Sequence, residues 1–221
     1  RGRNPERRAP AAEVREAFRS YAQYWLDTFR LPVMDLDVLD RRARIDGLEI
    51  VDDALARGRG TIVALPHMGS WDQAGAWLAH RGYRMTVVME RLQPRRLQDW
   101  FVAARERVGL HVVVRGEGVW DELEKALEEG HLIGLVCDRD LSGRGVPVRF
   151  FGEQTTLPAG PARLAFAAGA PLLPVGVYRG PGHRWSAVVG APLEAGSEEG
   201  DERVSALSQR LAEQLEQLIA R

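Results

Sequence analysis

Short apolar runs alternate with helix-like patterns along most of this chain of 221 residues. Several runs, such as TIVAL at 61–65, are rich in β-branched residues and lack alternating polar positions. Continuous apolar runs of this kind are typical of strands that are covered on both faces. We expect strands at 61–65, 84–89, 111–114, 132–137, 146–151, 172–178 and 184–189. Helix patterns lie between them at 70–80, 94–108, 118–129 and 160–168.

Strands that alternate with helices in this way indicate a protein of the α/β class. We expect a central, mostly parallel or mixed sheet of about seven strands, flanked by helices. No repeat or low-complexity linker divides the chain, so we expect a single domain over 1–221. Within it, 1–57 would form an N-terminal helical segment with a short helix near 47–57, and 58–190 would form the α/β core. The remaining residues, 191–221, would carry a C-terminal amphipathic helix at 201–220.

An aromatic stripe lies in the N-terminal segment. Between residues 11 and 30 apolar side chains recur at steps of three or four, which predicts a helix. The stripe consists of Val14, Phe18, Tyr21, Trp25 and Phe29. Two uses of it stay open: packing against the protein core, or insertion into the interface of a membrane.

Composition narrows the classes of function. The net charge of −1 argues against a strongly basic nucleic-acid-binding protein. Residues 1–30 nevertheless hold seven Arg against four acids; a solvated charge run is the more common explanation of such a basic end, and contact with an anionic membrane surface is the alternative. A lone cysteine, Cys137, excludes a disulfide within the chain and fits a reducing setting. No stretch approaches the roughly 18 apolar residues of a spanning helix, so we expect any membrane contact to be peripheral.

A histidine and an acid follow the first predicted strand of the core, in ALPHMGSWD. Pro66 ends that strand, and ligands of open α/β sheets bind beyond the carboxyl ends of the strands. The turn at 68–69 would let Asp72 fold back within hydrogen-bond reach of His67. A carboxylate on one ring nitrogen makes the other nitrogen a better base, so this pair is a candidate for proton transfer.

The serine between them has a second interpretation. Ser70 and Gln73 have the S-x-x-Q spacing of a capping box, so we expect Ser70 to cap the helix at 70–80. A hydrolase with Ser70 as nucleophile is the rival prediction. It is disfavoured because no G-x-S-x-G elbow surrounds this serine, and because capping would engage its hydroxyl.

Three charged residues, Asp138, Arg139 and Asp140, follow the predicted strand 132–137. Charges directly after a buried strand are expected at the same carboxyl edge. If that strand neighbours 61–65, Asp138 could also reach His67. Asp72 and Asp138 therefore compete for the role of orienting the imidazole, and the choice stays open.

Two further groups are candidates for substrate contact. Phe150 and Phe151 end a predicted strand and would suit an apolar wall, although core packing is the alternative. Gly160 opens a predicted helix and Arg163 lies in its first turn, an arrangement that presents N–H groups and a positive charge to phosphate.

An acid also ends a third predicted strand. Glu90 follows TVVM, and Arg105 lies inside the helix that comes next. The two residues would form either a structural ion pair or a contact with substrate.

Taken together these motifs resemble the glycerolipid acyltransferase superfamily, whose mark is the H-x4-D block seen in PHMGSWD. The ordered segments ALPHMGSWD, VVMERLQP, CDRDL and VRFFGEQTTLPAG are most similar to the branch that acylates lipid A and phosphatidylinositol mannosides, and within it to the actinobacterial mannoside enzymes. They fall within residues 61–178. Two departures are Asp138, where the mannoside enzymes more often carry Glu, and Ser70, where Asn is frequent.

The resemblance implies an acyl-CoA-dependent O-acyltransferase that is peripheral to the cytoplasmic face of the plasma membrane. Its partners would be acyl-CoA, a glycolipid acceptor and an anionic membrane surface, with no nucleic acid. The most similar enzymes transfer a long fatty acyl chain to a mannose hydroxyl of a phosphatidylinositol mannoside. The alternatives are another lipid acceptor (lipid A-like or lysophospholipid), hydrolysis of a lipid or of acyl-CoA, and a lipid-binding protein without enzymatic activity.

His67 would act as general base, oriented by Asp72 or Asp138. The candidate contacts to substrate or acyl-CoA are Glu90, Arg105, Arg139, Phe150, Phe151, Gly160 and Arg163. We expect neither a metal nor a bound cofactor beyond acyl-CoA as co-substrate, since the other histidines show no ligand spacing. A nucleotide-binding module is disfavoured because neither G-x-G-x-x-G nor a P-loop occurs.

Overall fold

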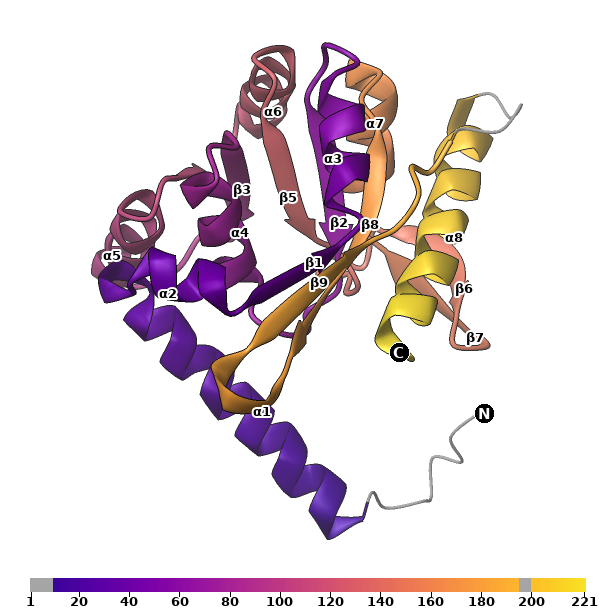
Figure 1. Cartoon of the computed structure of the whole chain (residues 1–221). Coiled ribbons are helices and arrows are strands. Elements are labelled where there is room, and N and C mark those ends of the chain that lie inside the picture. Colours follow the sequence, from indigo (N-terminus) through magenta and orange to yellow (C-terminus); the bar gives the residue numbers. More distant parts are fainter. Residues whose placement is uncertain (1–9, 195–199) are drawn as a thin grey trace.

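A seven-stranded sheet forms the centre of the protein in a computed structural model, which describes residues 10–194 and 200–221. The strand order is β1-β9-β8-β2-β5-β3-β4 (Figure 1). The strands are β1 (Ala43–Asp46), β2 (Thr61–Leu65), β3 (Met85–Met89), β4 (Leu110–Val114), β5 (Leu132–Val136), β8 (Leu172–Arg179) and β9 (Trp185–Val189). All neighbours are parallel except β8 and β9, so the predicted mixed α/β sheet is confirmed.

Helices cover both faces of this sheet. They are α1 (Ala11–Arg30), α2 (Leu36–Arg41), α3 (Leu48–Leu55), α4 (Trp71–His80), α5 (Arg95–Glu106), α6 (Val119–Glu128), α7 (Gly160–Ala168) and α8 (Gly200–Ile219). One core layer joins α6, α7 and α8 to one face, and another joins α3 and α4 to the other. All five residues of β2 are buried, as expected for a strand covered on both sides.

One segment that was predicted as a strand of the central sheet lies outside that sheet. The segment predicted as a strand at 146–151 forms β6 (Val146–Phe150), which pairs with β7 (Glu153–Leu157) in a separate hairpin. Val146 and Val148 of β6 are buried while Pro147 and Arg149 are exposed, so only one face of this strand packs, against α8. The short, polar β1 takes the seventh place in the sheet instead; neither it nor β7 was predicted.

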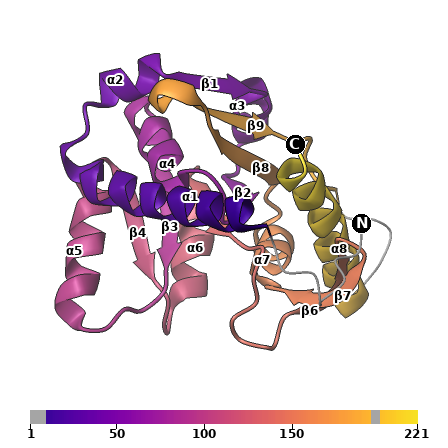
Figure 2. The same ribbon diagram turned by 90° about the horizontal axis from the view of Figure 1, so that it is seen from below.

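Helix α1 crosses the carboxyl edge of the sheet. It runs below the sheet in Figure 1, and Figure 2 shows it from below, with α2 and the β8–β9 turn on one side. Its buried residues are the polar Asp27 and Thr28, whereas Phe18 and Phe29 of the aromatic stripe are exposed. Core packing is therefore the wrong interpretation for most of the stripe, although Trp25 does pack on α5.

Candidate active site

Pairing of β2 with β5 brings His67 and Asp138 together. The last residues of the two strands, Leu65 and Val136, are register partners, and the next bond along runs from Cys137 N to Leu65 O at 3.0 Å. His67 and Asp138 each follow two residues beyond these ends. The register alone thus places the imidazole and the carboxylate side by side.

The contact is made twice. Asp138 Oδ1 accepts a hydrogen bond from the backbone N–H of His67 at 3.0 Å, and the same oxygen lies in hydrogen-bond contact with ring Nδ1. The edge of Trp71 packs against the imidazole, with 5.4 Å between ring centroids. With Nδ1 engaged, Nε2 is the ring nitrogen left to exchange a proton with a substrate.

The electrostatics favour a charged carboxylate. Burial alone would raise the pKa of Asp138, but the hydrogen bonds from His67 and the charge of a protonated imidazole hold it below its usual value. Asp138 can therefore stabilise an imidazolium at neutral pH.

Asp72 lies in a different network. Its side chain is 4% exposed and accepts bonds from Arg105 Nε at 2.9 Å and Nη2 at 3.3 Å. Tyr24 and Thr28 of α1 donate their hydroxyls to Oδ2 at 3.3 and 3.4 Å. Asp72 therefore does not make the expected contact with His67, because the first turn of α4 directs its carboxylate toward α1 and α5.

The predicted capping by Ser70 is wrong. Ser70 precedes α4, but its side chain makes no capping bond, and its hydroxyl is buried without a partner in the described part of the chain. Gly69 lies so close to β8 that an added Cβ would come within 2.2 Å of Val177 O. This close approach draws the turn onto β8, and Gln73 lines a polar cavity beside α1 instead of completing the box.

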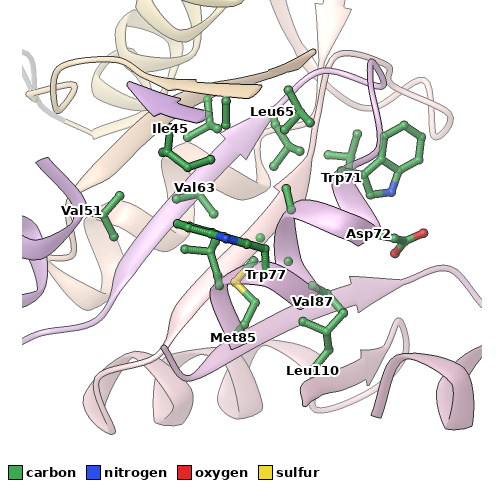
Figure 3. Close-up of a pocket in the computed structure, with 18 of the residues that line it drawn as sticks. Ile45, Val51, Val63, Leu65, Trp71, Asp72, Trp77, Met85, Val87 and Leu110 are labelled. Carbon is green, nitrogen blue, oxygen red and sulfur yellow. The ribbon is translucent and has the colours of Figure 1, made fainter. Parts of the chain in front are cut away.

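An apolar cavity lies in the layer between the sheet and helices α3 and α4 (Figure 3). Neither His67 nor Asp138 is among its lining residues. Leu65 and Val136, which end the strands before the pair, line it, as does Trp71. Figure 3 shows Trp71 and Asp72 on one side of the cavity and Val51 on the opposite side. Its apolar lining suits an alkyl chain, but its volume of about 100 Å³ holds only part of a long one.

Glu90 and Arg105 do not form the ion pair that was one of the two expectations for them. Glu90 forms an exposed ion pair of 2.6 Å with Arg115, not with Arg105. Arg105 lines the apolar cavity next to Asp72.

Phe150 and Phe151 do not line the apolar cavity. Phe150 packs against the α7–α8 core, and its ring meets the exposed ring of Phe151 edge-on at 4.9 Å. They lie on the β6–β7 hairpin, which leaves the central sheet, so the predicted apolar wall is not formed by them.

Gly160 is the first residue of α7, and Arg163 is exposed in the first turn. Because α7 leads into parallel strand β8, its N-terminus lies at the carboxyl edge with His67. Arg139 is likewise exposed at that edge, directly after Asp138.

Asp140 organises the loop after β5, a role that sequence reasoning missed. Its Oδ1 accepts the amide and hydroxyl of Ser142 at 2.9 and 2.7 Å, and its Oδ2 accepts Gly145 N at 2.7 Å and the Thr156 hydroxyl at 3.0 Å. The Ser142 hydroxyl, helped by the backbone amides, holds the pKa of Asp140 well below its usual value. The D-x-S spacing was the available signal, because Asp commonly bonds the amide two residues on.

Neither a membrane span nor a metal cluster occurs in the parts of the chain that the structure describes. Residues 10–194 and 200–221 contain no helix long and apolar enough to cross a bilayer. The same residues contain no group of three or more His, Cys, Asp or Glu side chains that could hold a metal ion.

Residues 5–221 match the family model described as bacterial lipid A biosynthesis acyltransferase. Phosphatidylinositol mannoside acyltransferase of Mycobacterium tuberculosis (strain ATCC 25618 / H37Rv) is 41% identical over 206 residues, which are 91% of this chain and 64% of the relative. The enzyme of that name from Mycolicibacterium smegmatis is 40% identical over 219 residues, 98% of this chain and 70% of the relative.

A more distant relative is the lipid A biosynthesis acyltransferase of Haemophilus influenzae, 28% identical over 73% of this chain and 52% of its own length. The chain spans about two thirds of the length of its mycobacterial relatives. The resemblance inferred from the motifs is confirmed: the chain belongs to the bacterial lipid A biosynthesis acyltransferase family.

Proposed function

We propose that this chain transfers a long fatty acyl group from acyl-CoA to a mannose hydroxyl of a phosphatidylinositol mannoside. The observation that carries the proposal is the His67–Asp138 pair, which lies two residues beyond Leu65 and Val136 of the apolar cavity lining. The names of the mycobacterial relatives support the choice of acceptor.

In the proposed reaction Nε2 of His67 removes the proton of the acceptor hydroxyl as its oxygen attacks the thioester carbonyl. Asp138 stabilises the resulting imidazolium. The tetrahedral intermediate then collapses, the carbon–sulfur bond breaks, and the imidazolium returns its proton to the CoA thiolate. An ester and free CoA are the products, and His67 ends neutral.

The negative oxygen of the intermediate needs hydrogen-bond donors. The first N–H groups of an α-helix have no partner within the helix, and those of α4 begin directly after the His67 turn. We assign them, with the exposed Arg139, to this role. Preorganised donors of this kind are commonly worth about 3 kcal/mol in acyl transfer.

The acyl group would occupy the apolar cavity, which would have to widen from about 100 Å³, with the thioester carbonyl toward His67 and the methyl end toward α3. Val51→Phe would fill the far end, so we expect the preference for palmitoyl-CoA over a shorter acyl-CoA to fall about tenfold, given the few methylenes excluded. Ile50→Phe, on the same helix but outside the cavity lining, is the matched control. Competition between the two acyl-CoAs in one reaction measures the ratio of their transfer rates. An unchanged ratio in Val51→Phe would mean that the acyl group binds outside this cavity.

The membrane contact would be made by α1. Its outward face carries Phe18, which is 70% exposed, together with Tyr21 and Phe29, while its inward face carries the buried Asp27 and Thr28 and the half-buried Trp25. Apolar side chains that point outward from a surface helix suit the interface of a bilayer. We infer a peripheral enzyme on the cytoplasmic face of the plasma membrane.

Replacing Phe18 and Tyr21 by Gln removes this apolar surface without touching the buried face of α1. We expect vesicle sedimentation of the variant to fall about tenfold, with an unchanged denaturation midpoint. Phe151→Gln, an exposed aromatic on the hairpin, serves as control. Full sedimentation of the α1 variant would remove α1 from the membrane contact.

The function is tested by CoA release from palmitoyl-CoA, followed with a thiol reagent, with and without a phosphatidylinositol mannoside. We expect release that depends on the acceptor and is lost in His67→Ala. Release that is independent of acceptor would indicate a thioesterase instead. No release by folded parent protein with either acyl-CoA or acceptor would contradict the proposed reaction.

A further inference from the structure

A second cavity, of about 460 Å³, lies between α1, the segment leading into β1 and the β8–β9 turn. It is distinct from the apolar cavity, with which it shares a single lining residue, Trp185. Its lining combines four arginines with apolar side chains such as Met34, Val38 and Leu39, unlike any surface used in the proposed reaction.

Three arginines at this cavity have no partner among the residues that the structure describes. Arg30, Arg42 and Arg184 line it and are exposed, and within residues 10–194 and 200–221 their guanidinium groups make no hydrogen bond or ion pair. They come from the end of α1, from the segment before β1 and from the β8–β9 turn. Parts of the chain that are distant in sequence therefore bring three positively charged side chains to this cavity.

The acids in the lining do not neutralise them. Asp27 is already paired with Arg179 at 2.6 Å and accepts a bond from Gln23 at 2.9 Å. Asp35 uses one oxygen to cap α2, accepting two backbone amides at 3.0 and 3.1 Å. The lining thus holds four Arg against two Asp, an excess of two positive charges.

The cavity also borders the exposed apolar surface. Arg30 lies between Phe29 and Val33, which are 53% and 77% exposed. If those side chains enter a bilayer interface, the cavity comes to the depth of the lipid headgroups, where basic side chains are attracted to anionic lipid.

We propose that this cavity binds the headgroup of a membrane phospholipid in which a phosphodiester carries a polyol, as in phosphatidylinositol. Arg30, Arg42 and Arg184 surround the phosphate, and the amides of Gln23 and Gln73 face the hydroxyls. The proposal rests on the membrane location given under the proposed function, but on no step of the reaction. The site anchors the enzyme next to its lipid acceptor.

The test is binding to vesicles of phosphatidylcholine that contain an equal fraction of either phosphatidylinositol or phosphatidylserine, which carry the same charge. The parent protein is compared with the double variant Arg42→Gln/Arg184→Gln. The control is Arg57→Gln/Arg107→Gln, which removes two exposed arginines at the amino edge of the sheet, far from α1. Denaturation midpoints of both variants show that they fold.

We expect the parent to prefer phosphatidylinositol vesicles, and the cavity variant to bind them about tenfold more weakly, while the control changes by less than about twofold. Soluble inositol 1-phosphate should compete better than inorganic phosphate. Equal binding to both anionic lipids, equal losses in both variants, or equal competition by inorganic phosphate would each overturn the headgroup site. Because no acyl-CoA is present, an enzyme without acyltransferase activity could still pass this test, so the two proposals fail separately.

Discussion

Asp138→Asn is expected to lower kcat for acyl transfer about 100- to 10,000-fold, since an amide stabilises neither the correct tautomer of the imidazole nor its protonated form. Asp138 Oδ1 accepts the His67 backbone N–H and also contacts ring Nδ1. The amide of Asn can still accept the backbone N–H, but it no longer places a negative charge beside the ring. Steady-state CoA release with saturating acceptor measures the change.

The effect should not add to that of the histidine. Because the two residues act as a unit, His67→Ala/Asp138→Asn should be about as slow as His67→Ala alone. Asp138→Glu should recover part of the rate if the backbone can yield to the longer side chain. Asp53→Asn, an exposed acid on α3, is the control. Turnover of Asp138→Asn within a few-fold of the parent would remove Asp138 from the mechanism.

The lowered pKa of Asp138 also predicts how the free energy of unfolding changes with pH. The pKa of Asp138 is lower in the folded protein than its usual value of 3.8, so the folded state binds the proton less readily than the unfolded state. The resulting stabilisation is complete well above pH 3.8 and is lost as the pH falls through the lowered pKa. Denaturation curves at low pH should therefore converge for the parent and Asp138→Asn. Curves that stay apart to the same extent at every pH would contradict this.

Much of the fold could be predicted because its strands carry strong local signals. The strands at 61–65 and 132–136 pack on both faces. Their continuous apolar sequences, without alternating polar residues, indicate this. The hairpin strand β7, with the sequence EQTTL, could not be predicted, because its polar residues are exposed and only pairing with β6 makes it a strand.

The choice between Asp72 and Asp138 could not be made from sequence for a related reason. Local geometry allows both acids to approach His67. The structure decides between them through the β2–β5 register, and through a contact between Tyr24 and Asp72 that spans 48 residues of chain. Contacts between residues so far apart in the sequence produce no local sequence pattern from which they could be predicted.

Asp72→Ala is expected to destabilise the protein by about 3–5 kcal/mol, the usual cost of removing one partner from a buried ion pair. Arg105 would keep its charge at a side chain that is only 13% exposed, with no carboxylate beside it. The hydroxyls of Tyr24 and Thr28 would lose an acceptor as well. For a chain of this size the denaturation midpoint should fall by about 10 °C.

A double variant separates this structural role from a catalytic one. Asp72→Leu/Arg105→Met removes both charges at similar volume, a change that is often neutral or stabilising in other proteins. We expect it to recover most of the lost stability and to keep turnover within about tenfold of the parent, because neither residue exchanges a proton in the proposed reaction. A stable double variant as inactive as Asp138→Asn would show that the acid of the H-x4-D block acts in catalysis, although its carboxylate contacts α1 and α5. The site would then have a second conformation, in which the Asp72 carboxylate contacts His67 and no longer Arg105.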